Sequence, residues 1–114
     1  MELLERFGWP DEDILDLGDI SHYFISDIVV TDPEGIKEYQ QRVGASLELY
    51  GGKFLVRGGT FEVLEGDWHP HRLILLEFES VEQAKRWYNS AEYASVKGIR
   101  HRTANTDFVL VQGL

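Results

Sequence analysis

Residues 71–78 predict a β-strand that is apolar on both of its faces. Side chains alternate between the two sides of a strand, and both alternating sets are apolar here: Leu73, Ile74, Leu75, Leu76 and Phe78. A strand of this kind is typical of the centre of a sheet that is covered on both sides. This requirement limits the chain to a layered architecture in which neither face of the sheet is left to water.

The patterns before and after this segment predict the other elements. Strands are expected at residues 22–30, 53–57 and 107–111, and helices at 32–50 and 80–102. Asp32 followed by Pro33 predicts the start of the first helix. Ser80 and Ser90 each predict a helix cap, so the second helix is expected to break at Ser90. Residues 61–65 are expected to continue in extended form after the second strand.

The resulting order is β-α-β-β-α-β, which places the chain in the α+β class with the split, ferredoxin-like arrangement. Its four antiparallel strands form one sheet, and both helices pack on the same face. The other face then stays uncovered although its side chains are apolar, and such a face is normally an interface. We therefore predict a homodimer in which two sheets pack face to face.

Composition excludes several classes of protein. A chain of 114 residues is the size of one domain with a single core. Its net charge of −9 argues against a nucleic-acid binder, because neutralising phosphates requires a basic surface. There is no cysteine, so disulfides and thiolate sites are excluded. No apolar run approaches the roughly 20 residues that span a bilayer, and residues 1–5 lack the basic start of a secretory signal. We expect a cytoplasmic protein without membrane contact.

Residues 1–20 differ in charge from the rest of the chain, because they carry seven acidic residues against Arg6 alone. Apolar residues at helical spacing on either side of Pro10 predict two short amphipathic turns. We interpret this segment as an arm that covers an apolar patch on its own domain or on a second subunit. Docking to another protein and a disordered tail are the alternatives. The folded domain is expected at residues 21–114.

Several stretches of this domain resemble a known family. They are residues 30–34, 50–59, 61–68, 77–78 and 87–93. In their order and spacing the chain resembles the bacterial family described as domain of unknown function 1330. The resemblance implies a dimeric α/β-barrel fold, in agreement with the strand order. That wider fold group contains cofactor-free oxygenases acting on aromatic compounds, lactone isomerases and haem enzymes, so the fold does not select a function.

Glu77 is the most informative polar residue, because it interrupts an apolar strand. A buried carboxylate must be paired or protonated. Arg72 points to the other face of the strand, so Arg57 on the preceding strand is the better partner. The Arg57–Glu77 pair is interpreted either as an ion pair that sets the strand register or as part of a pocket. In the pocket, Arg57 would bind an anionic group and Glu77 would act as a base.

Asp27 is a second carboxylate within a predicted strand. The first and third strands are neighbours in this topology, so Asp27 is predicted to lie near Glu77. Two close carboxylates raise the pKa of one of them and allow proton transfer. The alternative is an aspartate at the rim of a barrel or one that accepts a hydrogen bond from an arginine.

The four histidines do not predict a metal site. His69 and His71 are two residues apart, but a catalytic zinc site usually needs a third protein ligand, which Asp67 or His22 would have to supply. We interpret the histidines as exposed turn residues, and haem on His101 is not expected. The glycines match no phosphate-binding motif. We predict neither a cofactor nor a metal.

Tyr39, Trp68 and Tyr88 are residues of the kind that line pockets for flat apolar ligands. Tyr39 and Tyr88 also match the spacing of a helical core face. Trp68 lies in a turn outside any periodic pattern, so it is expected to pack on a second subunit or to cover a pocket mouth.

Two functions are compatible with these residues. One is a cofactor-independent oxygenase or isomerase acting on a small aromatic or unsaturated acid, with Arg57 holding the carboxylate and Asp27 or Glu77 moving a proton. The other is a non-catalytic dimeric module that binds a small ligand or a partner protein. The enzyme requires a pocket that contains a carboxylate of shifted pKa. The module requires no pocket, or one lined only by apolar groups.

Overall fold

The structure is a computed structural model, and it describes residues 22–114. The strands are β1 (His22–Val30), β2 (Lys53–Arg57), β3 (Leu73–Phe78) and β4 (Ala104–Val111). The helices are α3 (Ile36–Glu48), α4 (Val81–Tyr88) and α5 (Ala91–Thr103). The arm expected at residues 1–20 lies outside the described residues and stays a prediction.

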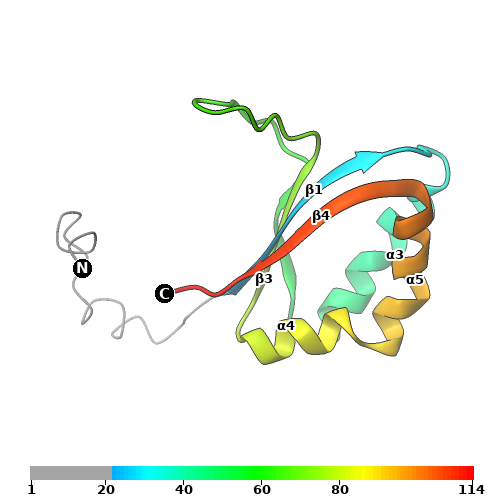
Figure 1. The fold of residues 1–114 in the computed structure, drawn as a ribbon. Coiled ribbons are helices and arrows are strands. Elements are labelled where there is room, and N and C mark those ends of the chain that lie inside the picture. Colours follow the sequence, from blue (N-terminus) through cyan, green and yellow to red (C-terminus); the bar gives the residue numbers. More distant parts are fainter. Residues whose placement is uncertain (1–21) are drawn as a thin grey trace.

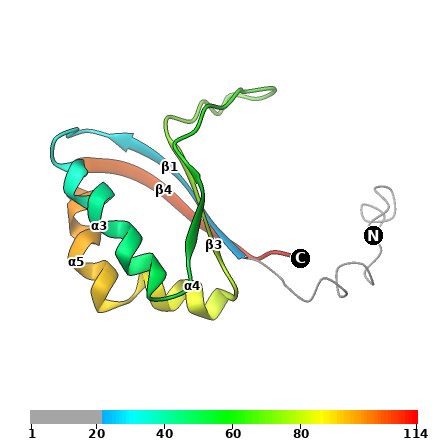
Figure 2. The same cartoon turned by 180° about the vertical axis from the view of Figure 1, so that it is seen from behind.

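The four strands form one sheet in the order β2-β3-β1-β4, and every neighbouring pair is antiparallel. The three helices lie on one side of this sheet, with α3 and α5 side by side (Figures 1 and 2). The predicted ferredoxin-like α+β fold is therefore confirmed. The apolar strand β3 lies inside the sheet, as its sequence requires.

Serine caps divide the second helical region as predicted. The Ser80 hydroxyl accepts a hydrogen bond from the backbone N–H of Gln83 at 3.0 Å, and the Ser90 hydroxyl accepts one from the backbone N–H of Tyr93 at 3.0 Å. The first helix begins later than predicted. The Asp32 carboxylate accepts a hydrogen bond from the Gly35 N–H at 3.1 Å and holds a turn there, so α3 starts only at Ile36.

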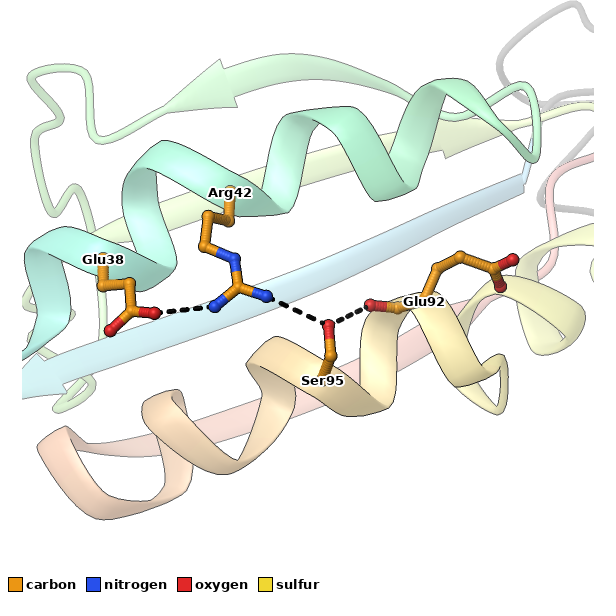
Figure 3. A network of polar contacts seen from close by, with 4 residues as sticks. All are labelled: Glu38, Arg42, Glu92 and Ser95. Carbon is orange, nitrogen blue, oxygen red and sulfur yellow. Dashed lines mark hydrogen bonds and ion pairs between the residues drawn. The ribbon is translucent and has the colours of Figure 1, made fainter.

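The core lies between the sheet and the helices, around the fully buried Trp87. Its indole N–H donates to the Ser46 hydroxyl at 3.0 Å, which satisfies the polar atom of this large apolar side chain. A polar network also joins α3 to α5 at the surface (Figure 3). There, Arg42 donates to Glu38 at 2.6 Å and to the Ser95 hydroxyl at 3.4 Å. The Arg42–Ser95 hydrogen bond links α3 to α5, whereas Glu38 and Arg42 both lie on α3.

Residues 58–72 form a long loop between β2 and β3 that projects away from the sheet (Figure 1). We refer to it as the β2–β3 loop. Residues 61–65, which were expected to be extended, pair with no strand of the described chain. The loop carries exposed apolar side chains: Phe61, Val63, Leu64 and Trp68. Leu64 is 83% exposed, so the loop leaves apolar surface uncovered.

The sheet face opposite the helices is partly apolar, and nothing within residues 22–114 covers it. Val109 on β4 is 55% exposed, and Val111 is 38% exposed. Neighbouring outward positions on β1 and β3 hold Ile25 and Leu75, which are register partners. No helix of the described chain covers this face (Figures 1 and 2).

Candidate functional site

A cavity lies between the sheet and helices α3 and α5, and we call it the Arg100 cavity. Its volume is about 40 Å³, and it is partly open to solvent. Most of its lining is apolar and comes from all four strands and from α3. The polar lining residues are Ser26, Tyr39, Gln40, Arg57, Arg72 and Arg100. The cavity therefore combines apolar walls with three guanidinium groups.

Arg100 is the most unusual of these residues, because it is only 4% exposed. Its Nε donates a hydrogen bond to the Tyr93 hydroxyl at 3.2 Å, and its guanidinium carbon lies 5.0 Å from the centre of the Phe108 ring. Its Nη2 lies 3.4 Å from Nε2 of His101. Within residues 22–114, no carboxylate forms an ion pair with Arg100. The guanidinium remains charged, so the cavity holds a buried positive charge.

Two tyrosine hydroxyls lie beside this buried charge and are hydrogen-bonded to each other. The hydroxyl of Tyr93 lies 2.8 Å from the hydroxyl of Tyr39, which lines the cavity. Burial raises the pKa of Tyr39 and outweighs the opposing effect of Arg100. Burial also raises the pKa of Tyr93. Both hydroxyls therefore keep their protons at neutral pH, so neither is a base there.

Arg57 lies at the other side of the cavity, on the edge strand β2. Its Nη2 donates to the backbone carbonyl of Gln40 on α3 at 2.6 Å, and its guanidinium lies 4.2 Å from the centre of the Phe54 ring. Arg72, just before β3, lines the cavity beside it. The prediction that Arg72 points away from the face of Glu77 is thus confirmed.

The predicted Arg57–Glu77 pair is wrong. Glu77 forms an ion pair with Lys53 at 3.2 Å, and its strand positions it on the face opposite the cavity. The reason is a β-bulge between Phe54 and Val56, which inserts one extra residue into β2. A shift of one residue moves a side chain to the other face of a sheet. The bulge therefore places Arg57 on the cavity side.

The predicted proximity of Asp27 and Glu77 is also wrong. Asp27 is opposite Leu73, whereas Glu77 is opposite Tyr23. Four residues of β1 separate these positions, or about 13 Å at 3.3 Å per residue. The two strands are neighbours as predicted, but the register keeps the carboxylates apart.

Asp27 instead holds the base of the β2–β3 loop. Its carboxylate accepts hydrogen bonds from the backbone N–H of His71 at 2.8 Å and of Arg72 at 3.3 Å, and from the indole N–H of Trp68 at 3.2 Å. Burial raises the pKa of Asp27, but these hydrogen bonds outweigh it and hold the pKa below its ordinary value. Asp27 is therefore ionised at neutral pH and serves as an acceptor.

Two of the four residues predicted to bind ligand, Tyr39 and Arg57, line the Arg100 cavity, and two do not. Tyr88 packs against Phe24 and Phe108, beside a more open hollow along β4. Trp68 is 60% exposed on the β2–β3 loop. The expectation that Trp68 packs on a second subunit stays a prediction.

Sequence reasoning missed Arg100. A signal was present, because Arg100 continues the buried face of α5 that begins with Tyr93 and includes Val96. The steps of three and four residues are those of one helical face. A basic residue within such a face indicates either an ion pair or a ligand.

No three His, Cys, Asp or Glu side chains within residues 22–114 lie together as a metal site. None of the described helices has both the length and the apolar character needed to cross a membrane.

Comparison with known proteins identifies the family. The model of the family described as "Domain of unknown function (DUF1330)" matches residues 21–114. The chain belongs to this family. The family description assigns no activity, and no curated protein matches the sequence.

Solved structures show where else this fold occurs. A protein of unknown function from Rhodopseudomonas palustris is similar with a TM-score of 0.67 and 16% identity, covering 92% of this chain and 95% of that one. SnoaB, a cofactor-independent oxygenase from Streptomyces nogalater, is similar with a TM-score of 0.57 and 10% identity, covering 83% of this chain and 94% of its own. At these identities the similarity shows the fold alone.

Proposed function

We propose that the protein is a binding module for a small organic acid, whose carboxylate lies against Arg100 in the Arg100 cavity. The observation that carries this proposal is the burial of Arg100 without a carboxylate partner in the described chain. A buried charge without a partner destabilises a protein by several kcal/mol. A carboxylate bound in the cavity would remove that cost and would accept hydrogen bonds from Arg100 and from the Tyr39 hydroxyl.

The size and lining of the cavity favour a flat unsaturated or aromatic acid. A buried water needs about 10–15 Å³, so a volume of about 40 Å³ accommodates one carboxylate-sized group. The rest of the ligand would extend along the apolar walls toward the exposed side, where Arg57 lies. A cavity of this small volume with mostly apolar walls favours a thin carbon chain over a bulky one.

The lining residues favour binding over catalysis. The enzyme alternative, in which a side chain moves a proton of the acid, requires a base in the cavity, and a carboxylate or an imidazole is the usual one. Neither type lines the Arg100 cavity in the described chain. The two catalytic candidates, Asp27 and Glu77, do not line it, and Tyr39, which does, holds its proton. The similarity to SnoaB supports the oxygenase alternative at the level of the fold only.

The same proposal includes a homodimer, with a second copy on the open face of the sheet. Support comes from the exposed apolar residues of β4 and of the β2–β3 loop: Val109, Val111, Phe61, Val63, Leu64 and Trp68. Apolar surface of this extent on a small domain is normally an interface. Sedimentation equilibrium tests this part, and a monomer at micromolar concentration would contradict it.

The binding proposal is tested with a matched pair of probes, trans,trans-hexa-2,4-dienoate and hexa-2,4-dien-1-ol. They share a planar carbon chain and differ in the charge of one end. Titration followed by NMR should show saturable binding of the acid alone, with shifts at Arg100 and Tyr39. Arg100→Met should weaken binding of the acid by about 10- to 100-fold, since a hydrogen bond to a charged group contributes about 1.5–3 kcal/mol. Arg86→Met is the control, because Arg86 is exposed on α4 and does not line the cavity. Equal binding of the acid and the alcohol would overturn the proposal.

A further inference from the structure

The Arg100 cavity contains more positive charge than one carboxylate requires. Arg57 and Arg72 line it together with Arg100, and within residues 22–114 none of the three forms an ion pair. The chain as a whole has 20 acidic residues against 11 Lys and Arg. Carboxylates are thus in excess over basic groups. Yet these three guanidinium groups line one cavity, and none of them is paired with a carboxylate of the described chain.

The strand register places the cationic residues at two ends. Arg57 on β2 is opposite Ile74 on β3, Ile74 is opposite Ser26 on β1, and Ser26 is opposite Phe108 on β4. All four therefore lie in one row across the sheet. Three strand spacings of about 4.8 Å separate the two ends of this row, or about 14 Å between Cα atoms.

Arg100 lies at the far end of this row, because its guanidinium packs over the ring of Phe108 at 5.0 Å. Arg57 lies at the near end, where it bonds to the Gln40 carbonyl of α3. Ile74 and Ser26 form the floor between them. The cavity thus has positive charge at both ends and a largely apolar middle.

We propose that the ligand is a dianion with two separated acidic groups, namely a dicarboxylic acid with a planar unsaturated chain. One carboxylate lies in the buried end against Arg100, and the other lies at the open end between Arg57 and Arg72. The apolar floor contacts the carbon chain. This inference rests on the proposed function, because it concerns the same cavity and adds the second acidic group.

The two ends differ in burial, and this predicts their separate roles. Arg100 is buried, so its contact with a carboxylate is little screened by salt. Arg57 is exposed and Arg72 is half-buried, so their contact with the second carboxylate weakens as ionic strength rises. The preference for a diacid over a monoacid is therefore expected to decrease with salt, whereas binding of the monoacid changes less.

The experiment compares trans,trans-hexa-2,4-dienedioate with trans,trans-hexa-2,4-dienoate, which share the carbon chain and differ in the second carboxylate. Calorimetric titration of the full-length protein should show the diacid binding about 10- to 100-fold more tightly, as expected for additional charge-assisted hydrogen bonds. The double variant Arg57→Met/Arg72→Met should bring the diacid to the affinity of the monoacid, and it should weaken binding of the monoacid much less than binding of the diacid. Both arginines lie outside the fully buried core, which favours a folded variant. The double variant Lys85→Met/Arg86→Met, at two exposed residues of α4 outside the cavity, controls for the loss of two positive charges.

The outcomes separate this inference from the proposed function. If both acids bind with equal affinity and the binding of both depends on Arg100, the proposal of a dianionic ligand is wrong and the acid-binding function stands. If the double variant retains the full preference for the diacid, the second carboxylate does not lie at Arg57 and Arg72, and the inference is overturned. If neither acid binds the wild-type protein at millimolar concentration, both proposals fail.

Discussion

Gly58 leaves the space that the side chain of Arg72 occupies. A Cβ atom built on Gly58 would overlap Nη1 and the central carbon of the Arg72 guanidinium. Gly58 also has a φ of 71°, in the left-handed region that favours glycine. Its N–H donates to the Leu73 carbonyl at 2.8 Å, which ties the start of the β2–β3 loop to β3. The position of a cationic cavity residue thus depends on the absence of a side chain fourteen residues earlier.

Gly58→Ala is expected to displace Arg72 and to destabilise the fold. The left-handed conformation costs a non-glycine residue about 1–2 kcal/mol. Denaturant unfolding should show this loss, and the preference for the diacid over the monoacid should decrease. Gly59→Ala is the matched control, because a Cβ there meets no atom within 4 Å and its φ is not positive. Equal effects of the two substitutions would contradict this account.

Tyr39→Phe is expected to weaken binding of the dienoate by about 10- to 100-fold, since a hydrogen bond to a charged group contributes about 1.5–3 kcal/mol. Burial raises the pKa of Tyr39 and of Tyr93, so both hydroxyls remain donors well above neutral pH. Binding to the wild-type protein should therefore be constant between about pH 7 and pH 9. A binding curve that decreases across this range would show that one of these hydroxyls loses its proton there.

Asp27→Asn is expected to destabilise the protein by about 1–3 kcal/mol at pH 7, because a hydrogen-bonded charge is removed. The new amide group also places a donor opposite the N–H donors of Trp68, His71 and Arg72. The folded-state pKa of Asp27 lies below its ordinary value. Its stabilising contribution is therefore complete above the unfolded pKa of about 3.9 and is lost as pH falls through the folded value.

The measurement for Asp27 is urea unfolding of both proteins between pH 2 and pH 7. The difference in unfolding free energy should be constant above about pH 5 and should shrink below about pH 4. A difference that stays constant down to pH 2 would show that the Asp27 carboxylate contributes no charge-dependent stability.

Ser90→Ala is expected to cost about 1 kcal/mol, the usual loss for a helix cap. Ser90 caps α5, the helix that carries Arg100, through the N–H of Tyr93. Ser95→Ala is the comparison, because Ser95 is exposed on the same helix and caps no helix: its hydroxyl donates to the Glu92 carbonyl and accepts a long hydrogen bond of 3.4 Å from Arg42. Thermal unfolding should separate the two variants by several degrees, as roughly 1 kcal/mol does in a domain of this size. Similar melting temperatures would argue against a capping role.

Local signals in the sequence were sufficient for the elements and their order. The caps at Ser80 and Ser90 act through side chains that bond to the backbone three residues on, so they are readable without tertiary structure. The apolar character of both alternating sets in residues 73–78 likewise reports the position of β3 inside the sheet. The start of α3 was predicted too early, at Asp32, because an aspartate stabilises a turn and a helix start by the same hydrogen bond.

The candidate site could be predicted only in part. Tyr39 and Arg57 were singled out and line the cavity, whereas Asp27, Glu77, Trp68 and Tyr88 do not. Arg100 carries the site and was missed, because a single basic residue on an amphipathic helix is more often solvent-exposed. Its burial depends on how α5 packs against the sheet.

The sequence by itself determined the fold class, the order of strands and helices along the chain, and the helix caps, since these follow from periodicity and from contacts within a few residues. Only the tertiary structure decided which charges meet. One extra residue at the bulge in β2 turns Arg57 from the face of Glu77 to the cavity, and the register of β1 with β3 keeps Asp27 away from Glu77. Side-chain direction in a strand has a period of two, so a change of one residue reverses a face. Such a change depends on pairing between distant segments, which no local pattern records.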